Sequence, residues 1–144
     1  MTFTDAKKEL AGYCDDEKLV KNGFDKIREL RAMANKLTAT YELKEGSVSG
    51  FGDRLAQYAA QSAQELDDMG ETLLAISAKN TIIRETVLKR MYGRYRRVLA
   101  DYYLYELAAK DIAEDMNIDL KHFYKEKDRA VAIYAGLREN EKSA

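Results

Sequence analysis

Hydrophobic residues recur at intervals of three and four in the first quarter of the chain. Between residues 16 and 37, the apolar positions are Val20, Phe24, Ile27, Leu30, Ala34 and Leu37. An α-helix completes a turn about every 3.6 residues, so this spacing places these side chains on one helical face. The pattern predicts a helix from Asp16 to Leu37 with one buried stripe, preceded by a shorter helix from Asp5 to Tyr13.

The helical pattern stops over residues 38–52. This segment reads TATYELKEGSVSGFG, and its glycine, serine and threonine residues favour turns over regular secondary structure. We therefore expect a long, mobile loop between two helices.

A longer helix is predicted from about Asp53 to Met91. Two series of residues repeat there every seven positions: Leu55, Ser62, Met69, Ile76 and Ile83 form the first, and Ala59, Leu66, Leu73, Asn80 and Val87 the second. Such heptads indicate coiled-coil packing, in which a polar residue such as Asn80 fixes the register of the paired helices. The partner is the first helix folded back as a hairpin, the same helix of a second chain, or both. Gly70 weakens this helix locally, by about 1 kcal/mol relative to alanine.

Gly93 interrupts the heptads, and shorter helices are predicted beyond it. Their expected bounds are 94–103, 107–116 and 120–135, with Gly136 as the stop of the last one. The chain contains no proline, which would break long helices. We therefore predict an all-α protein with an N-terminal helical hairpin of coiled-coil character. Its expected parts are a hairpin region over 1–92, a helix-turn-helix unit over 93–137 and a polar tail over 138–144.

The last two of these helices have the spacing of a helix-turn-helix. Ile118 is expected to fill the turn between them, and Asp119 to cap the second helix. In such units the second helix enters the major groove of DNA, while the first packs across it. The residues expected in their shared core are Leu107, Ala109, Ile112, Ala113, Phe123, Ala130 and Val131.

The segment RRVLADYYLYELAAKDIAEDMNIDLKHFYKEKDRAV resembles region four of the bacterial sigma factors. The matching motifs are Val98-Leu99, Asp111-Ile112-Ala113 and Ala130-Val131. With a helical hairpin ahead of it, the chain is similar to small sigma-like proteins of phages that infect low-GC Gram-positive bacteria, the ArpU-like and RinA-like late transcriptional activators. The resemblance spans residues 94–134 and implies a phage or prophage DNA-binding transcriptional regulator.

The resemblance also implies which residues contact double-stranded DNA. A reading helix over 120–129 would place Leu120, Lys121, His122, Tyr124 and Lys125 at base edges, where lysines reach guanine or phosphates. The residues expected to bind phosphates are Arg94, Arg96 and Arg97, with Lys110 as a further candidate. The alternative interpretation of all these residues is an ordinary solvated or salt-bridged helix surface.

Basic residues are concentrated close to this motif. A formal net charge of −1 argues against bulk electrostatic attraction to nucleic acid. Residues 1–78 contain 10 basic and 14 acidic residues, whereas residues 79–144 contain 14 basic and 11 acidic ones. Residues 79–110 alone contain 8 bases and 3 acids, so the positive charge lies immediately before the expected reading helix.

Several acidic residues depart from the sigma-like pattern. Asp119 replaces the usual serine or threonine cap, Leu120 replaces a polar base reader, and further acids flank the reading helix: Asp111, Glu114, Asp115, Glu126 and Asp128. They favour an alternative function, a phage-encoded inhibitor of the anti-CRISPR or RNA polymerase-binding type that meets a basic surface of a host machine. The partners expected besides DNA are host RNA polymerase or another host protein, and a second copy of the chain.

Little in the sequence indicates catalysis. His122 and Cys14 are the single histidine and cysteine, and neither a glycine-rich phosphate loop nor a zinc-ligand spacing occurs. We expect no enzymatic activity, cofactor, metal site or disulfide, and Cys14 should be a half-buried helix residue. The chain has neither the apolar core of a signal peptide nor a membrane-length apolar run, which predicts a location in the cytoplasm of the host bacterial cell.

Overall fold

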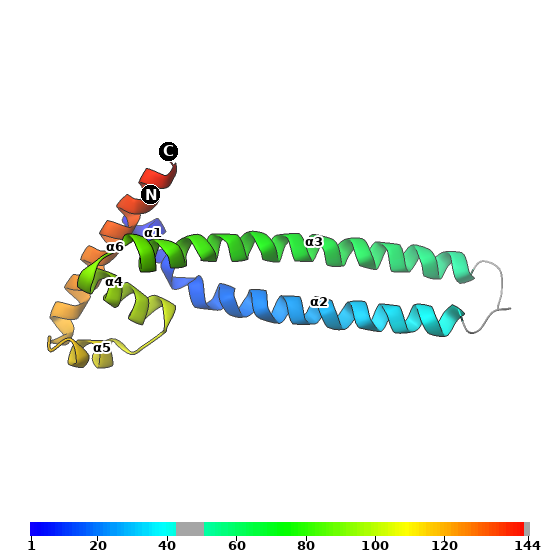
Figure 1. Ribbon diagram of the computed structural model, residues 1–144, viewed down its shortest axis with the longest axis horizontal. Helices are drawn as coiled ribbons and strands as arrows, with labels where there is room; N and C mark the ends of the chain where they lie inside the picture. The colour runs from blue at the N-terminus through cyan, green and yellow to red at the C-terminus, as the bar shows by residue number, and fades with distance from the viewer. Residues whose placement is uncertain (43–50, 143–144) are drawn as a thin grey trace. The chain divides into compact units, whose positions relative to one another are not determined.

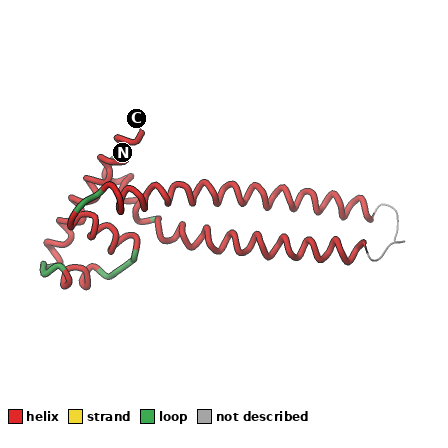
Figure 2. The backbone as a smooth tube through the Cα atoms, viewed as in Figure 1, coloured by secondary structure: helices red, strands yellow, loops and turns green. Residues whose placement is uncertain are grey.

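The computed structural model describes residues 1–42 and 51–142 (Figure 1). The elements are α1 (Phe3–Ala11), α2 (Tyr13–Glu42), α3 (Phe51–Glu85), the π-helical turn η1 (Thr86–Arg90), α4 (Gly93–Leu99), the π-helical turn η2 (Ala100–Leu104), α5 (Ala109–Asp115) and α6 (Leu120–Lys142). Figure 2 shows helices and loops but no strand within these ranges. The all-α prediction is therefore confirmed for the described residues.

The chain forms two compact units that do not follow its order in sequence. One contains Met1–Glu17 and Ala78–Ala144, and the other contains Lys18–Ser77. The boundary passes through α2 and α3, so α1 belongs with the C-terminal part of the chain. The parts expected from the sequence, 1–92 and 93–137, follow one another along the chain. That division does not place the N-terminal residues together with the C-terminal ones, as the structure does.

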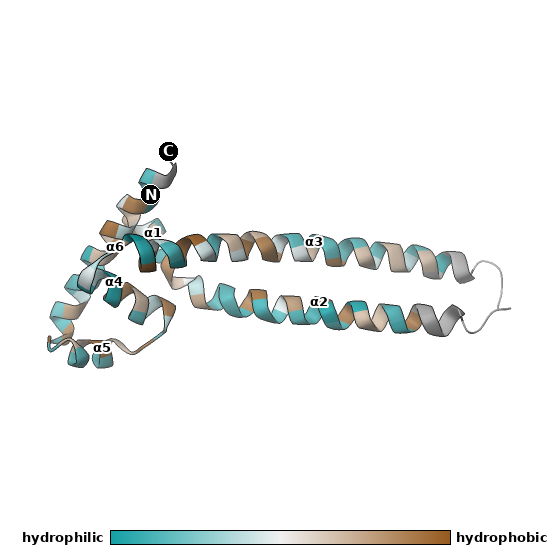
Figure 3. Ribbon diagram, in the orientation of Figure 1, coloured by the Kyte–Doolittle hydropathy of each residue, from teal (hydrophilic) through white to brown (hydrophobic). Residues whose placement is uncertain are grey.

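In the unit 18–77, α2 and α3 lie side by side and run in opposite directions (Figure 1). Ile27, Leu66 and Leu73 form its buried core, with Val20, Phe24 and Leu30 packed around them. Arg31 Nη2 donates a hydrogen bond to Asp67 Oδ1 at 2.8 Å and links the two helices at the surface. Figure 3 shows polar and apolar residues interspersed along both helices, as expected where only one narrow stripe is buried.

The predicted bounds of these two helices are wrong at several points. Residues 38–42 and 51–52 of the expected loop belong to α2 and α3, while residues 43–50 lie outside the described residues. Residues 38–42 contain no glycine or proline, so nothing in the backbone stops the helix before Glu42. Leu37, expected in the buried stripe, is 60% exposed. The stripe on α2 meets buried residues of α3 around Ile27, and Leu37 lies beyond that contact.

The heptads of α3 are buried unequally. Leu66, Leu73, Asn80 and Val87 of the second series and Ile83 of the first series are buried, whereas Met69 of the first series is exposed. The Asn80 side chain Nδ2 donates to the Tyr13 carbonyl and to Glu17 Oε1, each at 3.0 Å. A buried amide that binds a backbone carbonyl opposes sliding of the two helices, since any shift would leave a polar group unsatisfied.

The core of the other unit joins the two ends of the chain. Its buried residues come from α1, the end of α3, η1, α4, η2 and α6: Ala6, Leu10, Tyr13, Ile83, Val87, Met91, Leu99, Ala100, Tyr103, Leu104, Ala130, Val131, Tyr134 and Ala135. Cys14 is half-buried, as predicted, and its Sγ donates to the Tyr103 carbonyl at 3.1 Å. This core fixes the start of α2 and the middle of α6 in one structure.

Gly136 does not end α6, contrary to the prediction, and residues 138–142 of the expected tail are helical. Arg138 Nη2 lies 2.9 Å from Glu9 Oε1, and the Tyr134 hydroxyl donates to Glu9 Oε2 at 2.6 Å. Burial alone would raise the pKa of Glu9, but the hydrogen bonds from Arg138 and Tyr134 hold that pKa below its usual value. These bonds to α1 outweigh the helix-weakening effect of one glycine, about 1 kcal/mol.

Among the described helices, none combines the length and the apolar character that crossing a membrane requires.

Candidate nucleic-acid interface

A short turn, residues 116–119, joins α5 to α6. Asn117 takes the left-handed conformation, with φ of 55°, which asparagine tolerates better than most residues. Ile118 is half-buried in the turn, and its backbone N–H donates to the Ala113 carbonyl at 3.0 Å. Asp119 Oδ1 accepts a hydrogen bond from the His122 backbone N–H at 2.6 Å, so the predicted N-cap of α6 is confirmed.

One side of α6 is anchored in two cores. Phe123 packs with Val98, Ile112 and Ala113, and Ala130 and Val131 belong to the larger core of the same unit. These predicted core positions are confirmed. Leu107 is not buried, contrary to the prediction: it is 48% exposed, because the chain leaves η2 through a non-helical segment and α5 begins only at Ala109.

The opposite side of the first turns of α6 faces solvent. Its exposed residues include the predicted base-contacting set: Leu120, Lys121, His122, Tyr124 and Lys125. No hydrogen bond or ion pair within the described part of the chain engages the side chain of Lys121 or Lys125. These two ammonium groups are one helical turn apart and remain available to an anionic partner.

The predicted phosphate-binding arginines are exposed on α4 but already have partners. Arg97 Nη2 binds Asp115 Oδ2 at 2.6 Å, and its Nε lies 3.6 Å from Asp101 Oδ2. Arg96 Nη1 donates to the Leu88 carbonyl at 3.4 Å. Lys110, at the start of α5, is exposed and has no such partner among the described residues. The positive charge of Arg97 is therefore largely compensated within the protein.

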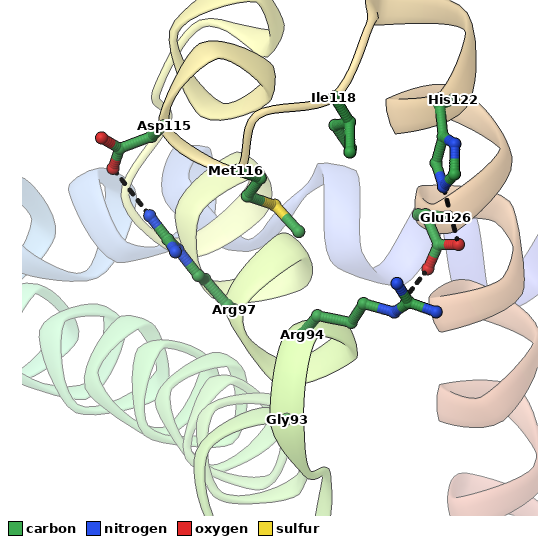
Figure 4. Close-up of a pocket in the computed structure, with 8 residues that line it drawn as sticks. All are labelled: Gly93, Arg94, Arg97, Asp115, Met116, Ile118, His122 and Glu126. Atoms are coloured by element: carbon green, nitrogen blue, oxygen red, sulfur yellow. Dashed lines mark hydrogen bonds and ion pairs between the residues drawn. The ribbon is translucent and has the colours of Figure 1, made fainter.

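Glu126 is a residue whose role the sequence did not reveal. Its side chain is only 2% exposed, and Arg94 Nε lies 3.2 Å from its Oε2. Its other oxygen, Oε1, lies 3.3 Å from His122 Nε2 (Figure 4) and 3.3 Å from Arg129 Nη1. His122 and Arg129 lie one helical turn before and after Glu126, and this spacing could have indicated their contacts with it. The partner on α4 was not predictable from local spacing.

The same residues line a pocket of about 430 Å³. It lies between α4, the end of α5, the turn and α6, and Figure 4 shows the side chains around it: Gly93, Arg94, Arg97, Asp115, Met116, Ile118, His122 and Glu126. Glu126 Oε2 accepts no hydrogen bond from any described residue. The pocket therefore has an apolar side formed by Met116 and Ile118, with the Arg94–Glu126 ion pair and Arg97 at its edge.

Lys127, next to Glu126, points to the other side of α6 and is almost completely buried. Its Nζ lies 4.6 Å from the centre of the Tyr102 ring and 5.0 Å from that of Tyr124. Burial, chiefly, and the positive charge of Lys7 lower the pKa of Lys127. Lys127 is thus a structural cation held by two aromatic rings and does not add to the exposed charge.

Within residues 1–42 and 51–142, no group of three or more histidine, cysteine, aspartate or glutamate side chains is arranged to hold a metal ion. Compared with protein-family models, with curated proteins and with solved structures, the chain matches none of them.

Proposed function

We propose that the chain is a non-catalytic DNA-binding transcriptional regulator of phage or prophage type, in which α5, the turn 116–119 and α6 act as a sigma-region-four-like helix-turn-helix. One observation supports this most strongly. The start of α6 exposes Lys121 and Lys125, which have no partner among residues 1–42 and 51–142, while the buried side of the same helix is anchored through Phe123, Ala130 and Val131. An anchored helix with uncommitted cations on its outer face suits docking into a major groove.

Each exposed residue has a defined part in this proposal. Lys121 and Lys125 bind guanine edges or phosphates, His122 donates a hydrogen bond, and Tyr124 contacts a thymine methyl group. Arg96 and Lys110 bind phosphates and position the helix without specifying a sequence. The hairpin of α2 and α3 supplies a surface for host RNA polymerase or for a second copy of the chain. Activity takes place in the host cytoplasm.

A second candidate function is binding to a basic surface of a host protein. α5 exposes three acids, Asp111, Glu114 and Asp115, against the single base Lys110. Asp115 also neutralises Arg97, which is expected from the sequence to bind a phosphate. Carboxylates repel phosphates and attract lysine and arginine side chains, so this surface fits an inhibitor of the anti-CRISPR or RNA polymerase-binding type.

The two candidates are separated by selection from random duplex DNA. The regulator should enrich a defined sequence, and the Lys121→Ala/Lys125→Ala variant should lose the enrichment. The control is Lys21→Ala/Lys26→Ala, which removes the same charge from exposed positions of α2. Recovery of an unselected pool by the wild-type chain would reject the DNA-binding proposal and favour the protein-binding one.

A further inference from the structure

The bond between Arg31 and Asp67 marks one side of the hairpin formed by α2 and α3. Successive residues of an α-helix are turned by about 100° around its axis. Measured from the buried Ile27, Arg31 is turned by about 40° in one sense. Four apolar residues of α2 are turned by about 60–120° in the other sense: Leu19, Leu30, Met33 and Leu37. They form a second stripe on α2, on the flank that faces away from Asp67.

α3 carries a matching stripe. Measured from the buried Leu66, Asp67 is turned by about 100° towards Arg31, and Leu74 by about 80° in the same sense. The apolar residues turned by about 60–80° in the opposite sense are Tyr58, Met69 and Ile76. Because Arg31 and Asp67 meet on one side of the hairpin, the stripes of the two helices lie together on the other. These seven residues are called the apolar side below.

The apolar side is largely uncovered. Leu30 and Ile76 are half-buried, while the other five residues are each more than two-fifths exposed: Leu19, Met33, Leu37, Tyr58 and Met69. Single exposed apolar residues are ordinary on a protein surface, but a continuous group of them indicates a surface that binds a partner. The apolar side is therefore a candidate interface.

The charges of the two helices favour a second copy of the chain as that partner. Residues 18–42 of α2 contain six basic and three acidic residues, whereas residues 51–77 of α3 contain one basic and five acidic residues. A surface with one positive and one negative edge complements itself when the copy is turned by 180° about an axis parallel to the helices, because α2 of each copy then meets α3 of the other. A perpendicular axis would place like charges together and is disfavoured.

The extent of the apolar side is sufficient for such an interface. From Leu19 to Leu37 it runs for about 27 Å, and two helices side by side are about 20 Å wide. Two copies would therefore bury roughly 1,000 Å², the lower limit for a specific interface. We propose that the chain forms a two-fold homodimer through the apolar side, a four-helix bundle in which α2 of each copy packs against α3 of the other. Apolar contacts supply the affinity, and the charges select the arrangement.

This choice of partner rests on the proposed function, which gives the hairpin a surface for host RNA polymerase or for a second copy. It does not require DNA, so self-association is measured on the chain alone. A chain that remains monomeric would overturn the dimer and leave recognition of DNA by α6 to its own test.

The first test is sedimentation equilibrium of the full chain without DNA, at concentrations up to about 1 mM. The mass should rise from 16.4 kDa towards twice that value. Leu37→Glu should weaken the dimer at least tenfold, because it places a charge in an apolar contact. Leu74→Glu is the matched control: both leucines are 60% exposed, but Leu74 lies on the side marked by Arg31 and Asp67, so the dimer should persist.

Three results would overturn the proposal: a monomeric wild-type chain at about 1 mM, equal effects of the two substitutions, or no effect of Leu37→Glu. Circular dichroism establishes whether each variant is folded. If Leu37→Glu does not fold, Met33→Glu, on the same stripe, takes its place.

Crosslinking tests the arrangement of the helices. Arg31 contacts Asp67, so Met33 is level with the start of the turn that contains Ser62, and an axis parallel to the helices preserves that level in the partner. In a Cys14→Ser background, a mixture of Met33→Cys and Ser62→Cys chains should give more dimer with a short bismaleimide than either variant alone. Equal crosslinking by Met33→Cys chains alone, or no crosslinking in the mixture, would overturn the packing of α2 against α3 of the other copy.

Discussion

Arg94 of α4 and Glu126 of α6 form an ion pair in which Nε and Oε2 lie 3.2 Å apart. The carboxylate is buried, the guanidinium is largely exposed, and the pair joins α6 to α4. A buried charge without partners is strongly destabilising, so the surrounding cations stabilise the carboxylate at this position. This relationship links the stability of the fold to the geometry of the candidate interface.

Substitution of Arg94 should destabilise the protein. Arg94→Ala removes the only cation beside Oε2 among the described residues, while His122 and Arg129 still contact Oε1. We expect a loss of about 1–2 kcal/mol in the free energy of unfolding, measured by urea denaturation. Arg96→Ala, on the same helix, is the control and should cost less than about 0.5 kcal/mol. Equal effects of the two substitutions would show that the pair does not stabilise the fold.

The contact between the two ends of the chain should make stability dependent on pH. The pKa of Glu9 is lowered in the folded protein, so its ionised form stabilises the fold above the unfolded-state pKa of about 4.3. This contribution is lost as the pH falls through the folded-state pKa. Glu9→Gln should therefore reduce stability at pH 7 by about 1–3 kcal/mol, and the difference from wild type should shrink below about pH 4. A difference that is constant with pH would refute the ionic contribution.

Two glycines in the hairpin should respond in different ways to alanine. A Cβ at Gly70 would meet only Ile27 Cδ1, at 4.0 Å, so Gly70→Ala should stabilise the protein by about 0.5–1 kcal/mol. A Cβ at Gly23 would lie 2.5 Å from Leu73 Cδ1 in the buried core. Gly23→Ala should therefore gain less than Gly70→Ala or destabilise the hairpin. Thermal unfolding of the two variants measures the difference, and equal stabilisation would mean that α2 and α3 do not approach closely there.

Two substitutions of Asp119 distinguish its role as a helix cap from an effect on the proposed DNA binding. Asp119→Ala removes the cap and should cost about 1 kcal/mol in the free energy of unfolding. Asp119→Ser keeps a capping oxygen but removes a negative charge from the outer face of α6. If this face binds phosphates, Asp119→Ser should bind duplex DNA about two- to fivefold more tightly, as fluorescence anisotropy would show. Weaker binding by a fully stable Asp119→Ser protein would count against a DNA-facing Asp119.

The sequence predicted the features that depend on local spacing. Ile112, Ala113 and Phe123 are buried because helical periodicity alone assigns them to one face, and Asp119 caps α6 because the cap needs only a neighbour three positions on. Gly136 shows the limit of local rules. Its helix-stopping tendency is real, but a contact with Glu9 at the other end of the chain overrides it.

The candidate site was predicted in part. Exposure of Lys121 and Lys125 follows from the same periodicity that buries Phe123. The pairing of Arg94 with Glu126 and of Arg97 with Asp115 depends on how three helices meet, which no local pattern encodes. Local patterns therefore leave open whether the arginines bind phosphates or form salt bridges, and they do not indicate that Glu126 is buried. Packing brings these residues together around a pocket.

The affinity for a selected duplex, measured as a function of salt concentration, tests the central proposal most directly. Binding through phosphates releases counterions, so the logarithm of the association constant should fall linearly with the logarithm of the salt concentration. We predict that Lys121→Ala/Lys125→Ala weakens binding and reduces the slope by about one to two units, while Lys21→Ala/Lys26→Ala changes neither. No binding at low salt, or a slope that the first variant leaves unchanged, would contradict DNA recognition by α6.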